Sequence, residues 1–143
     1  MMEAAAAAIR EKAAELGIER PKLLAVTILT SMDEEQFTDL NYKNTIAEQV
    51  LALAKLAKAA GLDGVVASPK EAEEIRKACG PDFLIVTPGV RPAGSALDDQ
   101  SRVTTPAQAF ANGSSHIVVG RPIMKAADRK QAAAAIVEEI KNI

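Results

Sequence analysis

Two apolar segments of the sequence end in the same combination of residues, a glycine with an arginine and a proline beside it. Phe83–Val86 continues into Thr-Pro-Gly-Val-Arg91-Pro, and His116–Val119 continues into Gly120-Arg121-Pro. An arginine guanidinium presents a fixed fork of donors, and a glycine lets a ligand approach the backbone N–H groups closely. We therefore predict a phosphate site, with Arg91, Gly120 and Arg121 as candidate ligands. Barrels of alternating strands and helices build such a site after their last two strands.

Hydroxyl groups follow a third apolar segment, residues 22–29. Thr30 and Ser31 stand at its carboxyl tip, where they could contact a ligand. Ser31 is also followed three residues later by Glu34, a spacing that is typical of a helix cap. Both interpretations stay open on the residues alone.

Other polar residues carry weaker signals. The small, polar stretch 92–102 is predicted to be a lid loop, and its Asp98 and Asp99 lack a third ligand for a metal ion. His116 is the only histidine, and a structural or exposed role is favoured over a catalytic one. Cys79 is expected to be a half-buried apolar filler. These residues predict neither a metal site nor a nucleophile.

Composition narrows the classes of function. The 143 residues carry 17 basic and 19 acidic side chains and few aromatic ones, which argues against nucleic acid as a partner. One cysteine allows no intramolecular disulfide, and neither a signal peptide nor a membrane span is expected. We expect a single unit over 1–143, located in the cytoplasm, with no membrane partner. The chain is too short for a complete eight-stranded barrel.

Strands and helices alternate along the sequence. A helix over 3–16 ends at Gly17, and later helices are predicted to begin at capping patterns and a Pro at the first helical turn. The predicted strands are 22–29, 63–67, 83–86 and 117–120, and the predicted helix starts are Thr45-Ile-Ala-Glu48, Ser68-Pro-Lys-Glu71, Thr105-Pro-Ala-Gln108 and Asp128. This order predicts a four-stranded parallel sheet with right-handed crossovers.

Five segments, in order and at similar spacing, resemble the second half of bacterial orotidine 5′-phosphate decarboxylase. They are Leu24–Ser31 (LAVTILTS), Gly61–Ser68 (GLDGVVAS), Val86–Pro92 (VTPGVRP), Asp98–Pro106 (DDQSRVTTP) and Ile117–Ile123 (IVVGRPI). The resemblance implies an α/β fold, half of a TIM (β/α)8 barrel, from a family that converts orotidine 5′-monophosphate to uridine 5′-monophosphate without cofactor or metal.

The resemblance also implies roles for individual residues. Arg91, Gln100, Gly120 and Arg121 match family positions that hold the phosphate and nearby nucleotide. Thr30 matches a position near the base, and Ser31 beside it is a further candidate. The expected ligand is therefore the nucleotide, substrate or product, or free phosphate.

The chain departs from the family pattern in its reacting groups. Family members carry an Asp-x-Lys-x-x-Asp motif and a further Lys on earlier strands, and this chain contains no such motif. We therefore expect no catalytic residue here and no decarboxylation by the chain alone. The alternative is an active decarboxylase formed by two copies or with the N-terminal half.

A half-barrel leaves two sheet edges and an apolar face uncovered. Barrel closure normally removes such edges, and a large apolar face normally finds a partner. We therefore expect a homo-oligomer that forms through the open half-barrel face, with two-fold pairing as the simplest arrangement.

Overall fold

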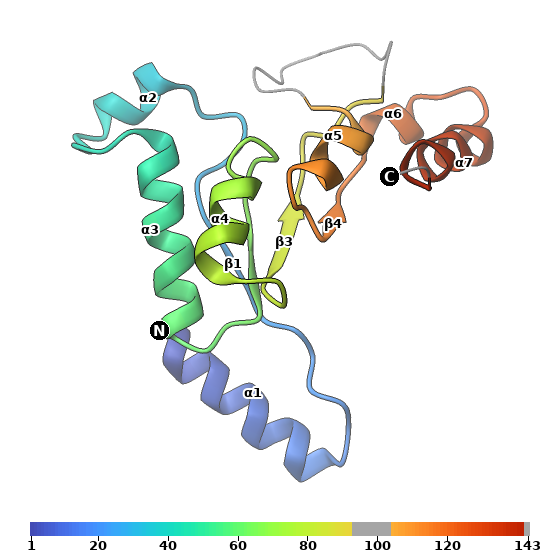
Figure 1. The fold of residues 1–143 in the computed structure, drawn as a ribbon. Helices are drawn as coiled ribbons and strands as arrows, with labels where there is room; N and C mark the ends of the chain where they lie inside the picture. The colour runs from blue at the N-terminus through green and yellow to red at the C-terminus, as the bar shows by residue number, and fades with distance from the viewer. Residues whose placement is uncertain (93–103, 142–143) are drawn as a thin grey trace.

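The computed structural model describes residues 1–92 and 104–141, and it is an α/β fold with one parallel sheet (Figure 1). The four strands are β1 (Leu24–Val26), β2 (Gly64–Val66), β3 (Leu84–Thr87) and β4 (His116–Ile117), and they lie side by side in chain order. The helices are α1 (Met2–Leu16), α2 (Glu34–Asp39), α3 (Ile46–Ala59), α4 (Ala72–Cys79), α5 (Pro106–Ala111), α6 (Arg121–Met124) and α7 (Arg129–Ile140). The predicted four-stranded parallel sheet with flanking helices is confirmed.

Most of the predicted helix ends are confirmed. The Thr45 hydroxyl accepts a hydrogen bond from the Glu48 N–H at 3.3 Å, and the Glu48 carboxylate accepts one from the Thr45 N–H at 2.9 Å. The Asp128 carboxylate caps α7 by accepting a hydrogen bond from the Gln131 N–H at 2.9 Å. Gly17 takes the left-handed conformation, with φ of 63°, where α1 ends. These local signals could be found in sequence because a cap needs only residues within one turn.

The predicted cap at Ser68 is wrong, and the cap that stayed open at Ser31 is not formed. The helix after Ser31 begins instead behind Asp33, whose carboxylate accepts from the Gln36 N–H at 2.8 Å, and Gln36 returns the bond in a full capping box. Ser68 does not open α4, because residues 69–71 form a turn closed by the Glu71 N–H on the Ser68 carbonyl at 3.1 Å. Pro69 therefore lies in that turn rather than at the first helical position.

Three strands, β1, β2 and β4, are shorter than predicted, whereas β3 keeps its predicted length and is shifted by one residue. The ladder of β2 and β3 ends after the bond from the Ala67 N–H to the Val86 carbonyl at 3.1 Å, because the next donor on that side would be Pro88, which has no N–H. The last bond between β3 and β4 runs from the Val118 N–H to the Thr87 carbonyl at 3.0 Å. The segment predicted as strand 117–120 therefore leaves the sheet early. Gly120 then stands before α6, a helix that was not predicted.

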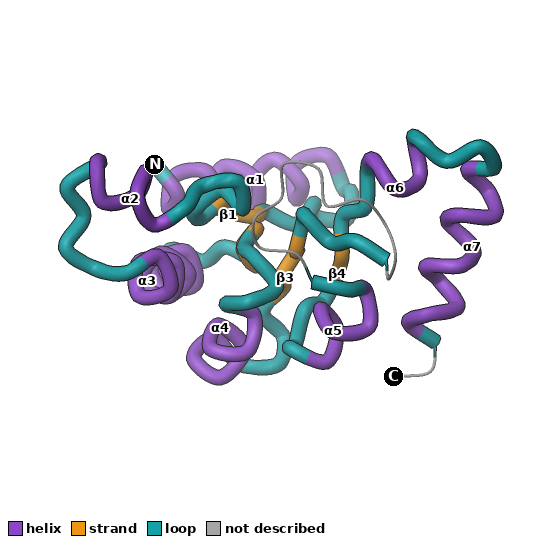
Figure 2. Tube along the Cα trace, turned by 90° about the horizontal axis from the view of Figure 1, so that it is seen from above, coloured by secondary structure: helices purple, strands orange, loops and turns teal. Residues whose placement is uncertain are grey.

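The two faces of the sheet differ in burial. Helices α3, α4 and α5 lie along one face (Figure 2), where Val65 and Ile85 are fully buried in the core with Val50 and Ile75. The residues on the other face remain partly or largely exposed, and we call them the open face: Leu24, Val26, Val66, Leu84, Val86 and His116. Val26 at 61% exposure is the clearest apolar example.

Within the described ranges, none of the helices combines the length and the apolar character that crossing a membrane would require.

Candidate functional site

The carboxyl ends of the four strands form the edge of the sheet after which the described candidate residues follow. Parallel strands bring their carboxyl ends to one edge, and ligands of open and closed α/β sheets bind there. Thr30 follows β1, Arg91 follows β3, and Gly120 with Arg121 follows β4. Because β3 and β4 are neighbours in the sheet, the two Gly-Arg segments lie after adjacent strand ends, as expected.

Arg91 is held inside the protein. Only 4% of the residue is exposed, its Nη1 donates to the Val90 carbonyl at 3.1 Å, and its backbone N–H donates to the Thr104 carbonyl at 3.0 Å. Gly89, with φ of 78°, makes the turn that brings the chain to this position. The Arg91 Nε atom is buried without a hydrogen-bond acceptor among residues 1–92 and 104–141. A guanidinium with an unused buried donor fits an anion that approaches from the carboxyl edge.

Gly120 and Arg121 lie where the chain turns from β4 into α6. The Gly120 carbonyl accepts from the N–H groups of Ile123 and Met124, both at 3.0 Å, so the turn is well defined. A side chain at position 120 would meet no atom within 4 Å, which leaves space beside the backbone there. Arg121 is half-buried at the first position of α6.

A cavity of about 320 Å³ opens at the other end of the same edge. Thr30, Ser31 and Pro88 line it, together with apolar residues of β1, β2 and the segments that follow them: Val26, Ile28, Leu29, Val66 and Ala67. Thr30 is half-buried and Ser31 is exposed. The structure therefore brings Thr30 and Ser31 together in one cavity, but neither Arg91 nor Arg121 lines it. Sequence reasoning missed Pro88 as a wall of this cavity, although the residue stands in a quoted motif.

The remaining predicted residues add no chemistry to this edge. Gln100, Asp98 and Asp99 lie outside the described residues, as does most of the predicted lid. Among the residues that the structure describes, no three His, Cys, Asp or Glu side chains are grouped as a metal site would require. Cys79 is 3% exposed, and burial raises the pKa of its thiol, which agrees with a role as an apolar filler.

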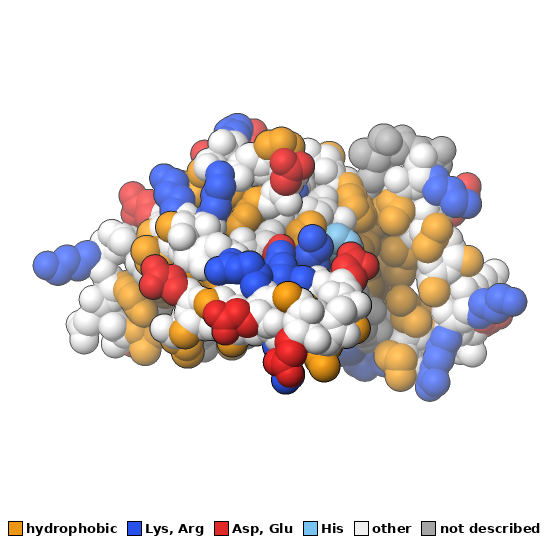
Figure 3. All heavy atoms as spheres, turned by 90° about the horizontal axis from the view of Figure 1, so that it is seen from below, with side chains coloured by type: hydrophobic (Ala, Val, Ile, Leu, Met, Phe, Trp, Pro, Cys, Tyr) orange, Lys and Arg blue, Asp and Glu red, His pale blue; other side chains and the backbone are white. Residues whose placement is uncertain are grey.

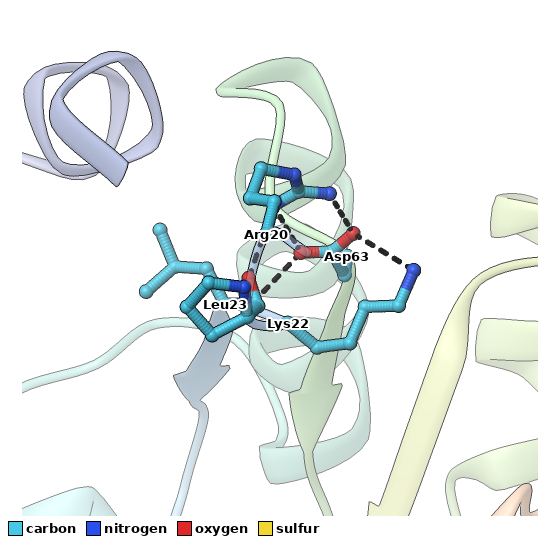
Figure 4. Close-up of polar contacts among 5 residues, drawn as sticks. Arg20, Lys22, Leu23 and Asp63 are labelled. Atoms are coloured by element: carbon cyan, nitrogen blue, oxygen red, sulfur yellow. Dashed lines mark hydrogen bonds and ion pairs between the residues drawn. The ribbon is translucent and has the colours of Figure 1, made fainter. Parts of the chain in front are cut away.

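The amino ends of the strands carry a group of ionic contacts around Asp63, and sequence reasoning did not find them. The Asp63 carboxylate accepts from the Arg20 Nη1 at 2.8 Å and from the Leu23 N–H at 2.7 Å, with the Lys22 Nζ at 3.9 Å (Figure 4). The Arg20 hydrogen bond is the main reason that the pKa of Asp63 falls to about 2. These contacts lie at the sheet edge opposite to the candidate site, where they can fix β1 against β2.

A larger cavity, of about 510 Å³, lies at this amino end, and its walls include Lys22, Lys58, Asp63 and Asp82. Figure 3 views the molecule from this side and shows basic and acidic side chains interspersed. Charges of both signs neutralise one another, so this cavity does not present the concentrated positive charge that a phosphate requires. The carboxyl edge remains the candidate site.

A family model described as Orotidine 5'-phosphate decarboxylase / HUMPS family matches residues 1–136. The orotidine 5'-phosphate decarboxylase of Trichlorobacter lovleyi is 57% identical over 140 residues, which are 98% of this chain and 57% of that protein. The enzyme of the same name from Moorella thermoacetica is 54% identical over 144 residues, covering 100% of this chain and 57% of its own.

Solved structures agree with this similarity. The crystal structure of orotidine 5'-phosphate decarboxylase from Lactobacillus acidophilus superposes with a TM-score of 0.72 at 48% identity, covering 87% of this chain and 51% of that one. An uncharacterised conserved protein from Geobacillus kaustophilus gives 0.78 at 38% identity, covering 98% and 58%. The chain spans about half the length of the curated relatives that it matches. With the family model and both relatives covering nearly all of its residues, the chain belongs to the Orotidine 5'-phosphate decarboxylase / HUMPS family.

Proposed function

We propose that the chain is the phosphate-binding half-barrel of an orotidine 5′-phosphate decarboxylase, acting in pyrimidine biosynthesis in the cytoplasm and inactive alone. The observation that carries the proposal is the position of Arg91, Gly120 and Arg121 after the carboxyl ends of the adjacent strands β3 and β4. Two guanidinium groups and an open glycine backbone suit a phosphate monoester, the group that substrate and product share.

The cavity beside Thr30 and Ser31 supports a nucleotide as the ligand. Its walls are mainly apolar, with two hydroxyl groups that can donate or accept hydrogen bonds. Apolar walls with a few placed polar groups are typical of small-molecule sites. We assign Thr30 to the part of the nucleotide near the base and the two arginines to its phosphate, with Gln100 as a further phosphate ligand.

The same cavity supports inactivity. None of its described wall residues carries an ionisable side chain. Decarboxylation develops charge at the reacting carbon, and preorganised charges are usually the largest catalytic contribution. Family members place Lys and Asp groups there from strands that this chain does not contain. The chain therefore binds one end of the substrate without groups to act on the other.

An assay of orotidine 5′-monophosphate tests this proposal against its alternative, an active enzyme formed by two copies or with an N-terminal half. We expect no loss of substrate absorbance with this chain alone. Turnover only after a polypeptide with the four missing strands of a relative is added would keep the chain inactive alone and support the second form of the alternative. Turnover by this chain alone, abolished by a substitution within it, would replace the proposal with the alternative.

Self-association is the second part of the proposal. The open face is apolar, Val26 is 61% exposed on it, and Val118 beyond β4 is 51% exposed. Exposed apolar faces of this kind mark interaction sites. We expect sedimentation equilibrium at micromolar concentration to give at least twice the chain mass. A monomer mass with native circular dichroism would remove this part alone.

A further inference from the structure

The two free edges of the sheet have complementary backbone patterns. Leu23 and Thr27 direct backbone groups to β2, because the Asp63 N–H donates to the Leu23 carbonyl at 2.9 Å and the Thr27 N–H to the Val66 carbonyl at 3.1 Å. Backbone groups of successive strand residues point to opposite sides, so Leu24 and Val26 direct theirs to the outer edge of β1.

At the outer edge of β4, the residues that direct backbone groups outward are the alternate set to those of β1. The Val118 N–H donates to the Thr87 carbonyl at 3.0 Å, so Val118 faces β3. Ile117 and Val119 therefore direct their N–H and C=O groups away from the sheet. In a parallel pair of strands, a residue whose backbone N–H and C=O point to the neighbouring strand stands opposite a residue whose own groups point away. The first residue bonds to the two residues that flank the second. Leu24 of one copy and Val118 of another satisfy this condition.

The register within the sheet drifts in one direction. Val26, the last residue of β1, pairs with Val66, the last of β2, which pairs with Val86 inside β3, and Val86 pairs with His116, the first residue of β4. A line drawn through paired residues from β1 to β4 therefore starts at the carboxyl end of β1 and reaches the amino end of β4. This drift is the stagger that tilts the strands of a closed barrel.

The size of the drift sets a register for closure by two copies. An eight-stranded barrel of this type accumulates a stagger of about eight residues in one circuit, so each two-fold related half contributes about four. Three pairings within one copy lead from Val26 to His116, and a fourth pairing leads from His116 to β1 of the second copy. With a stagger of about four residues, this line arrives at residue 22 of the second copy in place of residue 26. His116 stands opposite Lys22 of the second copy, and Val118 stands opposite Leu24 of the second copy.

We propose that a second copy of this chain covers the open face by parallel pairing of β4 with its β1, in the register that places Val118 opposite Leu24. The proposal rests on the self-association proposed above and adds its partner and geometry. The Leu24 N–H donates to the Ile117 carbonyl of the other copy, and the Val119 N–H donates to the Leu24 carbonyl. The two-fold axis repeats the contact, so both pairs of free edges are closed and the two open faces share one interior.

Cysteine cross-linking tests this register. In a Cys79→Ala background, which removes the native thiol, Leu24→Cys with Val118→Cys should give a covalent species of twice the chain mass with a short thiol cross-linker. Met32→Cys with Val118→Cys reports the opposite direction of stagger. Leu56→Cys with Val118→Cys is the matched control, because Leu56 is 57% exposed on α3, a helix on the covered face of the sheet (Figure 2). Circular dichroism and the sedimentation mass of each reduced variant show that it folds and assembles.

The outcomes separate the two proposals. Efficient cross-linking of the 24/118 pair, with little from the other two, supports the register. A dimer mass with cross-linking only of the 32/118 pair, or of neither edge pair, overturns it and leaves self-association standing. A monomer mass removes self-association and the register together. A monomer that forms a compact one-to-one complex with the other half of a relative's barrel identifies that half as the partner instead of a second copy.

Discussion

The carboxylate of Asp63 accepts a hydrogen bond from the guanidinium of Arg20 at 2.8 Å, across 43 positions of the chain. A second bond, from the Leu23 N–H at 2.7 Å, ties the same carboxylate to the start of β1. The side chain of Asp63 is 13% exposed. The contact therefore holds the segment before β1 against the start of β2, and it makes the charge of Asp63 part of the stability of the sheet.

The pKa of Asp63 is about 2 in the folded chain, against an ordinary value of 3.8. Because the pKa of Asp63 is lower in the folded than in the unfolded chain, its ionised carboxylate stabilises the fold at pH values above the unfolded pKa. This stabilisation, about 2 kcal/mol, is lost as the pH falls from about 4 to about 2. Asp63→Asn should lower the free energy of unfolding at pH 6 and flatten its loss in this window. Urea denaturation at several pH values measures both effects. The exposed Asp39→Asn should keep the wild-type pH profile, and an unchanged profile for Asp63→Asn would contradict the assignment.

Gly64 allows β2 and β3 to lie at their observed distance. A Cβ atom at this position would lie 2.2 Å from the Leu84 carbonyl oxygen, which belongs to the backbone and cannot turn away. Gly64→Ala should therefore lower the free energy of unfolding by about 2 kcal/mol or more, as overpacking of a rigid neighbour does. Gly120→Ala is the control, because it meets no atom within 4 Å. Equal midpoints of chemical denaturation for the two variants would refute this account.

Arg76 of α4 ties three carbonyl groups of the segment before β3 to the loop that leads into β4. Its Nη1 donates to Gly80, Pro81 and Phe83, at 2.8, 2.7 and 2.7 Å, and its Nη2 donates to Gly113 at 2.9 Å and to the Ser115 hydroxyl at 2.9 Å. A lysine side chain carries the same charge but lacks the planar guanidinium, whose two terminal nitrogens can donate in different directions. Arg76→Lys should lower the free energy of unfolding by about 2 kcal/mol, because carbonyl groups lose charged donors.

Lys77 provides the comparison for Arg76 on the same helix. Its side chain is 60% exposed and pairs with Glu73 and Glu74, each at 2.8 Å. Exposed ion pairs are screened by solvent and contribute little to stability, so Lys77→Ala should change thermal and chemical unfolding little. If Lys77→Ala were as damaging as Arg76→Lys, general disruption of α4 would explain both results better than the lost fork.

The sequence predicted the order of elements well because each depends on short-range signals. Apolar runs and caps such as Thr45 with Glu48 identify a strand or helix without knowledge of its neighbours. Strand ends could not be predicted in this way, because the ladder of β2 ends where Pro88, which follows the neighbouring strand β3, has no N–H to donate. The burial of Arg91 was equally hidden, since it depends on the contact of its segment with Thr104. Sequence reasoning therefore placed the candidate residues after strand ends, where they lie in the structure, but it could not give the burial of Arg91.

Arg121 gives the sharpest test of the phosphate site. If it holds the phosphate, Arg121→Ala should weaken binding of uridine 5′-monophosphate and of inorganic phosphate by roughly 1.5–3 kcal/mol, the contribution of a hydrogen bond to a charged group. The fold should survive, because Arg121 is half-buried in a helix of four residues. Calorimetric titration of both ligands measures the change.

Two further variants separate local contact from overall charge and from folding. Arg129→Ala removes the same charge from an exposed position at the start of α7 and should bind like the parent chain. Arg91→Ala should weaken binding and also lower the free energy of unfolding, because Arg91 is 4% exposed and its removal leaves a cavity. Equal affinities for the parent chain, Arg121→Ala and Arg91→Ala would remove the phosphate assignment, while equal weakening by Arg129→Ala would reduce it to a nonspecific effect of net charge.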